Sequence, residues 1–194
     1  MDKWFHIIWT NWISVNIINW NPHEKEYFSS EEFVSQIQAI TNIRWWIIST
    51  AISIEDFIDN SITYILFDTQ DINSELFQNI IMKGWGLTFD SKWKILREIT
   101  ERSSKTKDFY NKTIITSIKN CIEIRNIFAH WNLVYDFSNR LFFLESISKW
   151  ELSRKEITQE YLESSANKMY ECINSISMLV FWYETTVKLP YTKK

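Results

Sequence analysis

An arginine, an asparagine and a histidine lie within six positions of one another, at Arg125, Asn126 and His130. Histidine accepts and releases a proton near neutral pH, so it can serve as a general acid or a general base. The planar guanidinium of arginine can hold a phosphate through two parallel hydrogen bonds. An asparagine beside them can position either group or donate to a phosphate oxygen. These residue types at this spacing favour chemistry on a phosphodiester.

Apolar residues upstream of these three residues indicate a helix that ends at them. They recur at steps of three and four, the mark of one helical face, at Ile114, Ile118, Cys121, Ile122 and Ala129. We expect this motif helix to run from about Asp108 to about His130. At about 100° per residue, Asn126 and His130 lie on the same side, whereas Arg125 is about 140° from His130. We therefore expect Arg125 and His130 not to touch readily within one chain, but to meet at one phosphate or across a dimer.

The composition favours helices elsewhere too. Two glycines and two prolines in 194 residues are few for a turn-rich β-protein, and no glycine loop of the kind that cradles phosphates is present. We expect an all-α fold, an up-down bundle of about four to six helices. The first helix starts at a capping box with Ser29 as cap and reaches Phe67, with a kink near Thr41 and Asn42. Further helices are expected at residues 71–83, 90–102 and 158–186.

Two segments do not follow the helical pattern. Strand-like runs at residues 133–137 and 141–144, separated by Ser138 and Asn139, predict a small β-hairpin inserted after the motif helix. Residues 1–28 fit a helix as well as a strand, and we treat them as an N-terminal extension. Residues 29–188 then form a helical domain.

The motif resembles that of a known superfamily. Arg-Asn-x-x-Ala-His at positions 125–130 is similar to the Arg-x(4–6)-His signature of the HEPN superfamily, many of whose members are metal-independent ribonucleases. The resemblance extends over roughly residues 44–185. It implies an endoribonuclease in which the ribose 2′-hydroxyl attacks the adjacent phosphodiester. His130 would move the protons, Arg125 would hold the developing charge, and Asn126 would position one of these groups.

The resemblance also implies partners. HEPN ribonucleases join two motifs in a homodimer, and they act as toxins or in phage defence, with a possible antitoxin or regulatory protein. In members that are neutralised by a nucleotidyltransferase, a tyrosine lies two residues past the histidine. Asn132 occupies that place here, so we do not expect that mode of neutralisation. The alternatives are a non-catalytic HEPN module that binds RNA or a partner protein, and an unrelated helical interaction protein.

Further residues are candidates for supporting roles. In the HEPN resemblance a neighbouring long helix often carries a polar residue near the site, which makes Glu55 and Asp56 candidates to orient Arg125 or His130. The net charge is −3, yet nine basic residues against four acidic ones leave a local charge of +5 between residues 92 and 125. We expect RNA contacts from Lys112 and Lys119. The alternative for these charged residues is a solvated helix face.

The aromatic content adds one more RNA contact. There are eleven tryptophans, whose usual places are a core or an interface between subunits. Trp131, next to His130, is the candidate to stack on an RNA base.

The remaining patterns predict absences. Cys121 and Cys172 lack CxxC spacing, and no His, Cys, Asp or Glu cluster has the spacing of metal ligands, so we expect neither a metal nor another cofactor. Polar residues interrupt the apolar segment from Trp4 to Trp20, which argues against a signal peptide or a membrane span. We expect a cytoplasmic protein that does not associate with a membrane.

Overall fold

The computed structural model describes residues 6–10, 13–19, 21–67, 72–84, 86–102, 112–148 and 151–182. The chain divides into two compact units, each built from separate stretches of sequence. The first combines Met1–Ile48 with Ile124–Asn167, and the second combines Ser49–Glu123 with Lys168–Lys194. The helices α1 (Glu31–Phe67), α4 (Lys112–His130) and α5 (Gln159–Trp182) contribute residues to both units.

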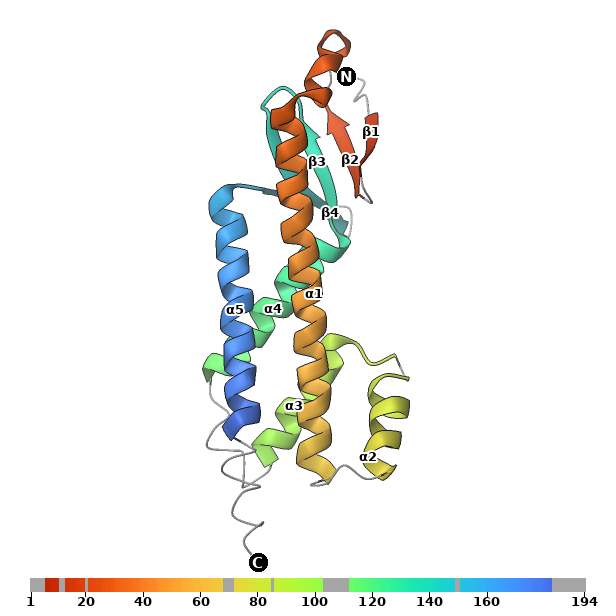
Figure 1. Cartoon of the computed structure of the whole chain (residues 1–194), viewed down its shortest axis with the longest axis vertical. Helices are drawn as coiled ribbons and strands as arrows, with labels where there is room; N and C mark the ends of the chain where they lie inside the picture. Colours follow the sequence, from red (N-terminus) through yellow and green to blue (C-terminus); the bar gives the residue numbers. More distant parts are fainter. Residues whose placement is uncertain are drawn as a thin grey trace, which may run out of the picture. The chain divides into compact units, whose positions relative to one another are not determined.

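A five-stranded sheet forms much of the first unit. Its strands run in the order β1 (His6–Thr10), β2 (Ile13–Ile18), β3 (Asn132–Asp136), β4 (Leu141–Ser148) and β5 (Glu151–Glu156). Neighbouring strands are antiparallel except for β2 and β3, which pair in parallel with Val15 opposite Leu133. Figure 1 shows β1 and β2 beside β3. The expectation of an all-α bundle is therefore wrong, and the fold is mixed α/β.

Local residue preferences explain the strands near the N-terminus. Val15 and Ile17 alternate with polar neighbours and are completely buried, so the strand pattern of this stretch prevails over its helical pattern. The scarcity of glycine does not prevent tight turns, because Asn19 and Arg140 adopt the left-handed conformation with φ of 58° and 56°. Asparagine tolerates this conformation well. The Arg140 guanidinium lies 3.8 Å from the centre of the Tyr27 ring, a cation–π contact that helps to hold its turn.

The first half of α1 packs onto this sheet after the 3₁₀ helix η1 (Pro22–Ser29). The ring of Phe33 lies 5.0 Å from that of Tyr135 on β3 and 5.7 Å from that of Phe142 on β4. The backbone N–H of Phe33 donates to the hydroxyl of Ser30, so Ser30 is the cap in place of Ser29. α1 also continues past Thr41, where we expected a kink, and the Thr41 hydroxyl donates to the carbonyl of Ile37 at 2.7 Å.

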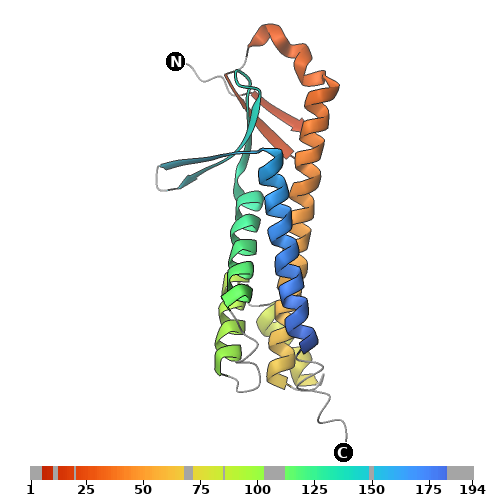
Figure 2. The same cartoon turned by 90° about the vertical axis from the view of Figure 1, so that its left-hand side faces the viewer.

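Figure 2 shows how the first unit continues beyond α4. β3 begins two residues after α4 ends, and β4 and β5 form a hairpin that leads to the start of α5. The hairpin of β3 and β4 confirms the predicted strands after the motif helix. All six residues of β5 are exposed.

The carboxylate of Asp136 stabilises the turn between β3 and β4. It is buried, and it accepts hydrogen bonds from the side chains of Asn19 and Asn139 and from the backbone N–H groups of Ser138 and Asn139. Burial by itself would raise the pKa of Asp136, but these hydrogen bonds outweigh it and lower that pKa.

This lowered pKa predicts a pH-dependent contribution to stability. The contribution is present above the ordinary aspartate pKa of about 3.9 and is lost as the pH falls through the lowered pKa of the folded state. We expect Asp136→Asn to reduce the free energy of unfolding by about 1–3 kcal/mol at neutral pH. The difference from the unmodified protein should shrink below about pH 4. Urea unfolding at several pH values measures it, and a difference that does not change with pH would contradict the prediction.

The second unit is helical in its described residues. Besides parts of α1, α4 and α5 it contains α2 (Ile72–Leu76), the π-helical segment η2 (Phe77–Met82) and α3 (Phe89–Arg102). Its buried apolar side chains include Ile54, Ile58, Ile62, Leu96, Ile118, Cys121, Met169 and Cys172. Throughout the described parts of the chain, we find no helix that combines the length and the apolar character needed to cross a membrane.

Candidate functional site

Arg125, Asn126 and His130 meet at the end of α4, within the first unit. Nη1 of Arg125 donates to Oδ1 of Asn126 at 3.0 Å and lies 3.2 Å from Nε2 of His130. Asn126 and His130 are exposed, whereas Arg125 is half-buried. Our expectation that Arg125 and His130 would not readily touch within one chain is wrong. The arginine stem is long enough to span the 140° that separates them, and His130 is the last residue of the helix.

The contact between Arg125 and His130 places a guanidinium donor beside one nitrogen of the imidazole. A guanidinium has only donors, so it can hydrogen-bond Nε2 only when that nitrogen is unprotonated. Asn126 must likewise present its carbonyl oxygen to Arg125, which directs its amide NH₂ group to other acceptors. The exposed cluster thus combines a proton acceptor, a fixed cation and an amide donor.

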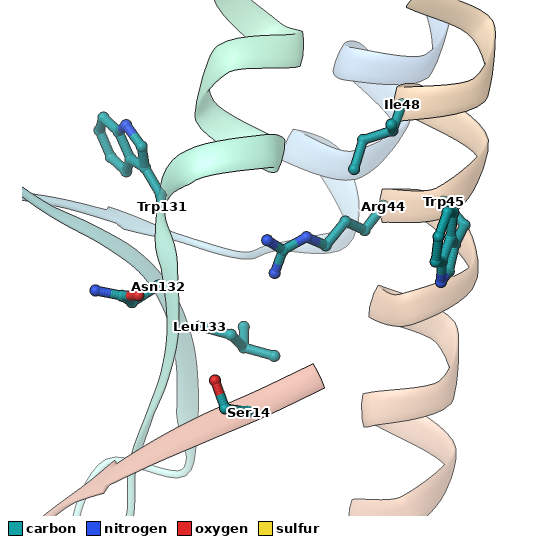
Figure 3. A pocket seen from close by; sticks show the side chains of 7 residues that line it. All are labelled: Ser14, Arg44, Trp45, Ile48, Trp131, Asn132 and Leu133. Carbon is teal, nitrogen blue, oxygen red and sulfur yellow. The ribbon is translucent and has the colours of Figure 1, made fainter. Parts of the chain in front are cut away.

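A second arginine, which the sequence analysis did not single out, lies close to this cluster. Nη2 of Arg44, on α1, is 3.4 Å from the carbonyl oxygen of Ala129, the residue before His130. Figure 3 shows the Arg44 side chain reaching from α1 toward the start of β3. Arg44 lines a pocket of about 250 Å³ together with Ser14, Trp45, Ile48, Trp131, Asn132 and Leu133. The signal in the sequence was a lone arginine beside Trp45 and Trp46 in an otherwise apolar helical segment.

The auxiliary candidates lie in the second unit. The carboxylate of Glu55 pairs with the Lys92 ammonium at 2.8 Å, and Asp59 pairs with the same ammonium at 2.8 Å. Asp56 is exposed on α1. The contact that the structure shows for Glu55 is thus with Lys92, and a role for Glu55 or Asp56 in orienting Arg125 or His130 stays a prediction.

The expected RNA contacts have different surroundings. Lys119 is exposed on α4, and Trp131 is half-buried in the wall of the pocket. Lys112 is the first residue of α4, and its side chain lies outside the described part of the structure. Their roles in binding RNA stay predictions.

Ion pairs with acidic side chains neutralise part of the positive charge counted between residues 92 and 125. Lys92 pairs with Glu55 and Asp59, and Lys94 pairs with Asp90, three acidic residues that lie outside the counted stretch. The sequence count therefore overstates the positive charge that this stretch can offer to a phosphate backbone.

Neither models of known protein families, nor curated proteins, nor solved structures show a match to this chain. The chemistry of the site therefore has to be inferred from the geometry of its own side chains.

Proposed function

We propose that this protein is a metal-independent endoribonuclease of the HEPN type. The observation that carries the proposal is the contact of 3.2 Å between the Arg125 guanidinium and the His130 imidazole on an exposed surface. RNA supplies its own nucleophile, the ribose 2′-hydroxyl, so the protein needs to provide only proton transfer and charge stabilisation. Histidine and arginine supply these two functions. The proposal does not require an all-α fold, because the three residues all belong to α4.

In the proposed reaction, a phosphate of RNA binds the Arg125 guanidinium in place of the imidazole. This frees Nε2 of His130 to accept the proton of the 2′-hydroxyl as its oxygen attacks the phosphorus. The bond from phosphorus to the 5′-oxygen breaks, and a protonated imidazole returns a proton to that oxygen. The products are a 2′,3′-cyclic phosphate and a 5′-hydroxyl. Arg125 holds the charge that develops on the phosphorane oxygens, and the Asn126 amide donates to one of them.

A single cluster of this kind leaves one imidazole to act as both base and acid. A homodimer that brings two clusters into one cleft would supply a second histidine and arginine, and we propose this assembly as the active form. We propose that the protein acts in the cytoplasm as a toxin or as a phage-defence effector. An antitoxin or regulatory protein would then control its activity.

The test of the proposed function is cleavage of RNA in the presence of excess EDTA. We expect the purified protein to cut single-stranded RNA and to leave ends with a 2′,3′-cyclic phosphate, which mass spectrometry identifies. RNA whose 2′-hydroxyls are all methylated should remain intact, because its nucleophile is blocked. Binding of unmodified RNA without any cleavage would contradict the nuclease and would favour the non-catalytic HEPN module.

A further inference from the structure

Arg44 is a half-buried cation on α1. Within the part of the chain that the structure describes, no carboxylate pairs with its guanidinium. Burial lowers the pKa of Arg44, as expected for a charge that is partly removed from water. Its contact with the carbonyl oxygen of Ala129, at 3.4 Å, is longer than a typical N–H···O hydrogen bond of about 2.9–3.0 Å. Because a guanidinium carries five N–H donors, Arg44 retains capacity to bind an anion.

Aromatic, apolar and polar residues line the pocket beside Arg44. Trp45 and Trp131 line it together with Ile48 and Leu133, and Ser14 and Asn132 add polar groups. In Figure 3 the Leu133 side chain points toward the Arg44 guanidinium, whereas the side chains of Trp131 and Asn132 point away from it. Trp45 is 55% exposed, so its indole is open to a ligand. The volume of about 250 Å³ is below the roughly 300–1,000 Å³ of pockets for drug-sized ligands. The space therefore suits one base or one phosphate group of a nucleotide better than a longer ligand.

The position of the pocket connects it to the catalytic cluster. Trp131 and Asn132 directly follow His130, and Arg44 contacts the carbonyl of the residue that precedes it. A cation and two tryptophans are the groups that proteins use to bind single-stranded RNA, through its phosphates and through stacking on its bases. The bases of a duplex are not available for such stacking.

We propose that this pocket binds the nucleotide next to the scissile phosphate of a single-stranded RNA. Arg44 contacts the phosphate of that nucleotide, and Trp131 or Trp45 packs against its base. This inference rests on the proposed function, because it takes RNA as the substrate. It makes Arg44 a binding residue that determines where along the strand His130 acts.

Binding of a 2′-O-methyl RNA oligonucleotide tests the pocket without any cleavage. We expect Arg44→Gln to weaken binding in fluorescence anisotropy by about ten- to a hundredfold, the usual effect of losing hydrogen bonds to a charged group. The affinity of Arg44→Lys should lie between that of the unmodified protein and that of Arg44→Gln, because lysine keeps the charge and loses the planar fork. The control is Lys168→Gln, which removes an exposed positive charge on α5, outside the basic stretch of residues 92–125. It should change the affinity less than twofold.

A second measurement does not depend on how the variants fold. The unmodified protein is crosslinked by ultraviolet light to an oligonucleotide that contains 4-thiouridine, and mass spectrometry locates the modified peptide. Crosslinks at Trp131 or Trp45 support the proposal, whereas crosslinks confined to other segments overturn it. Unchanged affinity of a folded Arg44→Gln variant, or no binding of RNA by the unmodified protein, also overturns it. If RNA binds through Arg44 but is never cut, the result supports the proposed RNA-binding pocket and contradicts the proposed nuclease.

Discussion

Replacement of His130 by alanine is expected to lower the rate of RNA cleavage by at least about 10²- to 10⁴-fold, the usual contribution of a general acid or base. In the proposed reaction the imidazole accepts the proton of the 2′-hydroxyl, and its Nε2 lies 3.2 Å from Nη1 of Arg125, the group that would hold the phosphate. Alanine is a good helix former, and His130 is exposed at the end of α4, so the fold should persist. Single-turnover cleavage at saturating RNA measures the loss.

Two further variants separate catalysis from structure. Arg125→Lys keeps a positive charge but cannot reproduce the planar fork, so we expect cleavage to fall by about 10²-fold or more. Glu123→Ala, an exposed position on the same helix, is the matched control and should leave cleavage unchanged. If His130→Ala cuts RNA at the normal rate, His130 only complements the dipole at the end of its helix, and the proposed mechanism is wrong.

Replacement of Lys92 by alanine is expected to reduce the free energy of unfolding by about 3–5 kcal/mol, the usual cost of removing one partner of a buried ion pair. The Lys92 ammonium contacts the carboxylates of Asp59 and Glu55 at 2.8 Å each, and the Asp59 side chain is only 1% exposed. Oδ1 of Asp59 is buried, and no hydrogen-bond partner for it is found among the residues that the structure describes. Loss of Lys92 would therefore leave a buried carboxylate with no cation beside it. Chemical denaturation monitored by circular dichroism measures the effect.

The cost of removing Lys92 should depend on pH in a definite direction. Burial raises the pKa of Asp59 even though Lys92 opposes this effect, so without Lys92 the carboxyl should take up a proton more readily. We expect the destabilisation by Lys92→Ala to be smaller near pH 5 than near pH 8. The matched control is Lys94→Ala, which breaks an exposed pair with Asp90 and should cost at most about 1 kcal/mol. Equal effects of the two substitutions would show that the Lys92 cluster contributes no more than a surface ion pair.

The sequence was sufficient to locate the helices, because their apolar spacing is local. α3 starts at Phe89, one residue before its predicted start, and Thr88 accepts the capping hydrogen bond from the backbone N–H of Ser91. Threonine, like aspartate, is among the residue types preferred at this position. α5 starts at Gln159, one residue after its predicted start, and the Thr158 hydroxyl accepts a capping hydrogen bond from the backbone N–H of Tyr161.

The sheet and the pocket depend on contacts between residues that are far apart in the sequence, which local sequence patterns do not reveal. Val15 pairs with Leu133, and Arg44 contacts a carbonyl 85 positions further along the chain. A strand pattern at the N-terminus was visible, but its partner was not, so the strands were assigned to a separate extension. The three residues of the motif were found because they are neighbours on one helix. Arg44 was missed because its position beside them is created by folding.

The parallel pairing of β2 with β3 has a consequence for protein synthesis. Leu133 leaves the ribosome long after Val15, so β2 lacks this neighbour until most of the chain has been made. Pairing between such distant segments is also slow to form. His130 is translated just before β3, so all of α4 is made before the sheet can be completed.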